Sequence, residues 1–92
     1  MAARLITQRR EVRSDGSIVE AVIWERDEPI PPCEHRFKYR LALVVNGDCI
    51  VRYDNERGKG DHRHIGEDEL PYRFVDLDRL LVDFRNDVET ES

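Results

Sequence analysis

Two Asx-Gly dipeptides, Asp15-Gly16 and Asn46-Gly47, restrict the possible folds of this chain more than any other feature. Each lies between two segments of alternating, β-forming residues, which is where a tight hairpin turn needs residues that accept positive φ. The segments joined in this way are residues 4–13 with 17–25, and residues 37–45 with 48–54. The sequence therefore predicts two β-hairpins in one antiparallel sheet.

Alternation along residues 37–45 predicts which side chains share a face of the sheet. Apolar residues occupy one face, and a basic row begins the other; that row is Arg36, Lys38 and Arg40. The row lies at the end of the hairpin where the last strand leaves, so we expect it close to residues 57–64. The polar segment 4–13 is expected at a sheet edge, and Trp24 in the core.

The last element predicted is a helix from about Asp76 to Val88, with Asp76 as its N-cap. Its apolar residues fall on one stripe at helical spacing: Leu77, Leu80, Leu81, Phe84 and Val88. The predicted fold class is α+β, a four-stranded antiparallel sheet from two hairpins with a C-terminal helix packed on one face (ββββα). The single domain, residues 1–92, divides into a first hairpin (3–28), a Pro-rich linker (29–35), a second hairpin (36–55), a polar functional loop (56–74) and the helix (75–89).

Composition limits the classes of function. A chain of 92 residues with net charge −5 forms one small domain without a global basic field, so any nucleic-acid contact needs a local basic patch. Cys33 and Cys49 are too few for a disulfide framework, and we find neither a signal peptide nor an apolar run of membrane-spanning length. We expect a cytoplasmic protein that does not enter a membrane, and a homodimer is one way for so small a core to be completed.

Residues 53–64 are the candidate functional segment. Gly58 and Gly60 argue against a helix or a central strand, so we expect a loop. Metal-independent cleavage of RNA needs a base, an acid and cations for the developing charge. In this hypothesis His62 and His64 are base and acid, and Asp61 orients one imidazole. The remaining assignments are Arg63, Lys59 and Arg57 for the transition state, Arg36, Lys38 and Arg40 for the RNA backbone, and Tyr53 and Tyr72 for stacking on bases.

Three alternatives stay open for these residues. The segment is equally compatible with a solvated, salt-bridged loop in which the histidines only hold the backbone. The tyrosines are equally compatible with ordinary packing. A zinc site built from Cys33, His35, His62 and His64, with Asp61 in reserve, is the third, but its C-x-H and H-x-H spacings are weak. We therefore predict no metal and no cofactor.

Three stretches resemble the TumE family of toxins from bacterial and archaeal toxin–antitoxin modules. They are the run from Tyr53 to His64 continued by Pro71–Asp76, the segment Ser14–Glu20, and His35–Arg40, so that the likeness covers about residues 9–88. The resemblance implies a toxin paired with a DNA-binding antitoxin of the helix-turn-helix type, and endoribonuclease action is the mode of many such toxins. The rival interpretation is a non-catalytic module, such as a subunit of a regulator, that uses the same basic segment to bind nucleic acid or protein.

Overall fold

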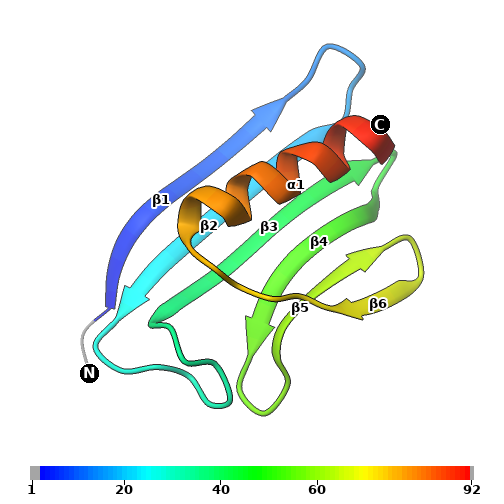
Figure 1. Ribbon diagram of the computed structural model, residues 1–92. Coiled ribbons are helices and arrows are strands. Elements are labelled where there is room, and N and C mark those ends of the chain that lie inside the picture. Colours follow the sequence, from blue (N-terminus) through cyan, green and yellow to red (C-terminus); the bar gives the residue numbers. More distant parts are fainter. Residues whose placement is uncertain (1–2, 92) are drawn as a thin grey trace.

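The computed structural model describes residues 3–91, which form a six-stranded antiparallel sheet and one helix (Figure 1). The strands are β1 (Ala3–Val12), β2 (Ile18–Arg26), β3 (Phe37–Val45), β4 (Asp48–Glu56), β5 (Gly60–Ile65) and β6 (Asp68–Pro71), and the helix is α1 (Leu77–Glu91). Each strand pairs with the next one in the sequence. The α+β class, the antiparallel sheet and the C-terminal helix are therefore confirmed.

Both predicted hairpins form around their Asx-Gly turns. Asn46 and Gly47 have φ values of 51° and 83°, the pair of positive values that a type I′ turn requires. At the first turn Gly16 has φ 86°, and the Asp15 carboxylate accepts a hydrogen bond from the Ser17 amide at 2.9 Å. The turn residues thus fix the register of β1 against β2 and of β3 against β4.

The prediction of four strands is wrong, because most of segment 56–74 is a third hairpin and not a loop. Gly58 and Gly60 have φ values of 87° and 79° and lie at the turn that follows β4. They reverse the chain without interrupting a strand, so that β5 pairs with β4 from Glu56↔Gly60 to Val51↔Ile65. A further turn at Gly66, with φ 59°, leads into β6.

Helix α1 covers one face of the sheet (Figure 1). Its buried residues Leu80, Phe84 and Val88 pack on apolar side chains of the central strands. Those side chains are Ile23, Tyr39, Leu41, Leu43, Val51 and Tyr53. The predicted N-cap is observed, since Asp76 Oδ1 accepts a hydrogen bond from the Arg79 amide at 2.8 Å. We call the covered side of the sheet the helix face and the other side the open face.

Trp24 lies outside the core, contrary to expectation. It pairs in register with Lys38, whereas its neighbour Ile23 points into the core. Alternation therefore turns Trp24 to the open face, where its side chain is 38% exposed.

The Pro-rich linker packs beside the turn between β4 and β5. Ile30 and Cys33 are buried, and the Gly58 amide donates to the Pro31 carbonyl at 2.9 Å. Over residues 3–91, the helix is neither long nor apolar enough to cross a membrane.

Candidate functional site

The alternation of β5 divides the predicted catalytic residues between the two faces of the sheet. Asp54 pairs with His62, and Arg52 pairs with His64, so these four side chains project from the open face. Tyr53 pairs with Arg63, which therefore projects from the helix face, as does Asp61. One substrate cannot contact both sets at once. We call Arg52, Asp54, His62 and His64 the open-face cluster.

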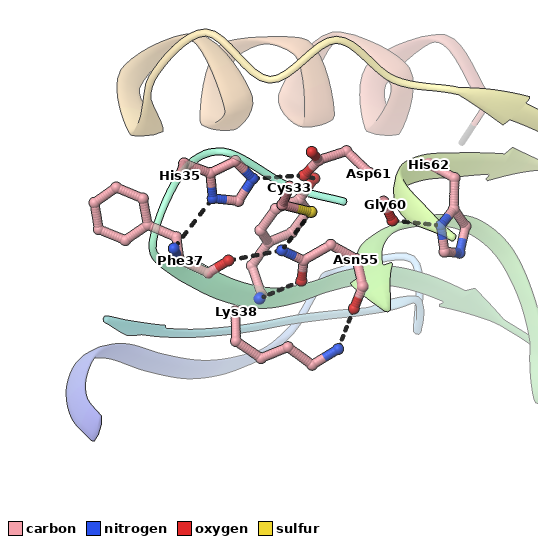
Figure 2. A network of polar contacts seen from close by, with 9 residues as sticks. Cys33, His35, Phe37, Lys38, Asn55, Gly60, Asp61 and His62 are labelled. Carbon is pink, nitrogen blue, oxygen red and sulfur yellow. Dashed lines mark hydrogen bonds and ion pairs between the residues drawn. The ribbon is translucent and has the colours of Figure 1, made fainter. Parts of the chain in front are cut away.

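His62 is held by protein groups on both sides of its ring. The residue is only 4% exposed, and its Nε2 lies 2.5 Å from Asp54 Oδ1. Its Nδ1 lies 3.2 Å from the Gly60 carbonyl oxygen (Figure 2). Neither His62 Nε2 nor Asp54 Oδ1 makes a hydrogen bond of acceptable geometry. His62 is therefore poorly placed to reach a substrate in this conformation.

His64 is the more accessible imidazole. Its Nε2 lies 2.8 Å from Arg52 Nη2, and because a guanidinium can only donate, that nitrogen is the acceptor. Burial and the neighbouring Arg52 cation lower the pKa of His64 below its usual value of 6.5. Arg52 also lies beside Asp54, with 3.1 Å between Arg52 Nε and Asp54 Oδ2. A neutral imidazole and a guanidinium thus stand side by side on the open face.

Two of the three predicted backbone-binding cations lie near this cluster. Arg40 is exposed and pairs in register with Asp54, which pairs in turn with His62. Lys38 reaches the Asn55 carbonyl (Figure 2). Arg36 precedes β3, is 56% exposed and forms an ion pair at 3.8 Å with Glu25. The expected proximity of the basic row to residues 57–64 therefore holds for Lys38 and Arg40.

The turn before β5 carries two further cations, Arg57 and Lys59. Both are exposed in the turn between β4 and β5. Lys59 Nζ lies 2.7 Å from Glu69 Oε1, and this hydrogen bond raises the pKa of the lysine. Lys59 is thus tied to β6, whereas Arg57 extends from the turn.

Asp61 does contact an imidazole, but that of His35. Its Oδ1 accepts from His35 Nε2 at 2.8 Å and from the Tyr39 hydroxyl at 2.6 Å. The other ring nitrogen of His35 accepts from the Phe37 amide at 3.1 Å, so both nitrogens are satisfied (Figure 2). This arrangement joins the linker, β3 and β5.

Arg63 and the two tyrosines anchor helix α1. Arg63 Nη1 lies 3.3 Å from Asp87 Oδ2, and the Tyr53 hydroxyl donates to the same carboxylate. The Tyr72 hydroxyl donates to Asp83 at 2.7 Å. Tyr53 is fully buried, which leaves its ring no face for a base. Both tyrosine hydroxyls therefore contact α1, and the buried ring of Tyr53 does not reach a substrate in this structure.

The four-residue zinc site considered from the sequence does not assemble among residues 3–91. Its members belong to two separate groups, Cys33–His35–Asp61 on the helix face and Asp54–His62–His64 on the open face. Within each group the potential ligand atoms lie within 4.8 Å of one another. Sequence reasoning missed Arg52 and Asp54. The spacing Arg52-x-Asp54 mirrors His62-x-His64, but this signal has meaning only once β5 is known to pair with β4.

Comparison with known proteins gives one match. A protein-family model described as Toxin TumE matches residues 2–92, which is essentially the whole chain. No match was found among curated proteins or among solved structures.

Proposed function

Because the chain belongs to the TumE family of toxins, we propose that it arrests growth as a metal-independent endoribonuclease that binds RNA on its open face. The observation that carries this proposal is the pairing of His64 with Arg52 at 2.8 Å beside exposed Arg40. It supplies a neutral base and cations on one surface that no element of residues 3–91 covers in Figure 1.

His64 is the proposed general base. Its lowered pKa keeps the imidazole neutral near physiological pH, so that it can take the proton of a 2′-hydroxyl. Arg52 is the proposed cation for the charge that develops on the phosphorus oxygens. The leaving 5′ oxygen takes a proton from solvent, because His62 is enclosed between Asp54 and Gly60. We assign His62 to positioning the cluster.

The rest of the open face suits single-stranded RNA. Lys38 and Arg40 are the proposed contacts to the phosphate backbone. The exposed ring of Trp24, beside Lys38 in the sheet, offers a surface on which a base can stack. Arg36, Arg57 and Lys59 border this face as further cations for a longer RNA.

The family also suggests an antitoxin partner, and we propose one of the helix-turn-helix type that binds DNA. The acidic surface of α1 is a candidate binding surface for a basic antitoxin segment, because Asp78, Glu89 and Glu91 are exposed on this helix. In that arrangement antitoxin and RNA occupy opposite faces of the toxin.

The deciding experiment is induction of the toxin alone in a bacterium, with mapping of new RNA ends. His64→Ala should abolish both growth arrest and the new ends, because it removes the base. His35→Ala is the matched control, since it removes an imidazole from the helix face only. Both variants are checked for folding by circular dichroism. Arrest and cleavage that persist in a folded His64→Ala variant would refute the proposal.

The second candidate is a non-catalytic binding module on the same face. It is favoured by His62, which is only 4% exposed between Asp54 and the Gly60 carbonyl and so offers little access to a substrate. In that case RNA stays intact, and charge reversal in Arg40→Glu should weaken partner binding far more than His64→Ala does.

A further inference from the structure

We propose that Asp54, His62 and His64 form a binding site for a zinc ion, and that zinc switches the open face off. The three residues come from two neighbouring strands and point the same way. Their ligand atoms lie within 4.8 Å of one another. Two imidazoles and one carboxylate are the donor set of many open zinc sites, in which a fourth position is left for water or substrate.

The contact between His62 and Asp54 is the observation that points to a cation. His62 Nδ1 faces the Gly60 carbonyl, which can only accept, so this nitrogen carries the proton. On the other side of the ring, His62 Nε2 lies 2.5 Å from the carboxylate oxygen Oδ1 of Asp54. Both atoms are buried, and neither makes a hydrogen bond of acceptable geometry. Two buried polar atoms in such close contact need a positive charge, which a metal ion bound to both would supply.

The surroundings of His62 match those of a metal-bound histidine. A metal-ligating histidine usually donates its second N–H to a carbonyl or carboxylate, which fixes the tautomer and the ring orientation. Gly60 fills that role for His62. Asp54 is not held in the same way, because Arg52 Nε, 3.1 Å from its other oxygen, makes no hydrogen bond of acceptable geometry. Zinc ligands at about 2.0–2.1 Å from the ion lie roughly 3.3 Å apart, so binding would widen the contact by a little under 1 Å.

His64 is the third ligand, and Arg52 is the competitor of the ion. In the structure the His64 Nε2 lone pair accepts from Arg52 Nη2 at 2.8 Å. The guanidinium must leave that nitrogen for the ion to take it, and its charge repels the ion. Removal of Arg52 should therefore strengthen zinc binding, an effect that a purely structural cluster would not show.

The second group of potential ligands provides an internal control. In the Cys33–His35–Asp61 group, Asp61 already accepts from His35 and Tyr39, and His35 has both nitrogens satisfied. Burial also raises the pKa of the Cys33 thiol, which opposes the thiolate that zinc prefers. Hydrogen bonding within the chain accounts for this group without an ion.

The test measures zinc directly. The full chain is freed of metal with a chelator, dialysed against micromolar zinc and analysed for metal per chain. We expect one zinc per wild-type chain and at least tenfold weaker binding in His64→Gln and in Asp54→Asn. Zinc binding should be unchanged in the control Cys33→Ser and tighter in Arg52→Gln. His64 is partly exposed, so its variant should keep the fold where a change at buried His62 risks losing it. Absence of bound zinc, or zinc lost only in Cys33→Ser, would overturn the site.

The regulatory consequence rests on the proposed function of His64 as a base. Zinc on His64 removes the lone pair that accepts the 2′-hydroxyl proton, so one equivalent of zinc should suppress RNA cleavage, and a chelator should restore it. Cleavage unaffected by bound zinc would overturn the switch while leaving the site in place. If the wild-type chain cuts no RNA at all, the metal measurements still decide whether the zinc site exists.

Discussion

A single carboxylate, Asp61, connects three segments of the chain. It projects from β5 and accepts hydrogen bonds from His35 in the linker and from Tyr39 in β3. Burial disfavours its ionised form, but the hydrogen bonds from His35 and Tyr39 outweigh burial and hold the pKa of Asp61 below its usual value of 3.8. The carboxylate is thus a structural group whose charge favours the folded state.

Replacement of Asp61 should therefore lower stability in a pH-dependent way. Asp61→Asn keeps an oxygen that can accept from both donors but removes the negative charge that strengthens the two hydrogen bonds, so we expect the free energy of unfolding at pH 7 to fall by about 1–3 kcal/mol. The lowered pKa means that the contribution of Asp61 is present above the unfolded value near 3.8 and is lost as the pH falls below it. Urea unfolding at pH 7 and at lower pH measures both effects, with exposed Asp48→Asn as the control.

The outcome distinguishes an ionised from a neutral Asp61. The difference in stability between wild type and Asp61→Asn should shrink as the pH falls below the usual value of 3.8, whereas exposed Asp48→Asn should leave stability nearly unchanged. A constant difference as the pH falls would show that the charge of Asp61 contributes nothing.

The residue types of the site could be predicted, but their partners could not. The sequence marks Asp61, His62, Arg63 and His64 as a dense polar group. Which of these side chains lie on the same face depends on the alternation of a strand, and a predicted loop has no such alternation. Only the pairing of β5 with β4 brings His62 to Asp54 and sends Asp61 to His35.

At the scale of the element, the third hairpin depends on how its turn glycines are used. The two turns with Asx-Gly pairs follow common hairpin rules, and both were predicted. The turn between β4 and β5 has no Asx-Gly pair, and its glycines predict a loop because glycine inside a strand is unfavourable. The glycines lie at the turn and at the first residue of β5, so that argument does not extend to residues 61–65.

Gly58 and Gly60 provide a matched pair for testing this turn. Both have positive φ, 87° and 79°, so alanine at either position should cost about 1–2 kcal/mol of conformational strain. A Cβ on Gly60 would also lie 3.3 Å from Cγ of Pro32, whereas a Cβ on Gly58 would meet open space. We expect Gly60→Ala to lower the urea midpoint more than Gly58→Ala does. Equal losses would mean that the linker does not pack against the turn as described.

At the scale of the whole molecule, positive and negative charges are distributed unevenly between the two faces. The net charge is −5, yet the cations Lys38, Arg40 and Arg52 share the open face. Helix α1, on the other side of the sheet, carries more acidic than basic residues: Asp78, Asp83, Asp87, Glu89 and Glu91 against Arg79 and Arg85. A protein with this distribution can attract RNA to one face while its total charge repels it.

Salt dependence tests whether RNA uses the open face. Each phosphate contact with single-stranded RNA contributes about 0.7 to the slope of log affinity against log salt. Arg40→Gln should weaken RNA binding and reduce this slope by about that amount. Arg85→Gln removes the same charge from exposed α1 and should leave the slope unchanged. Because net charge changes equally in both, a uniform effect would indicate non-specific attraction to the whole molecule, whereas an effect at Arg40 alone would assign the RNA to the open face.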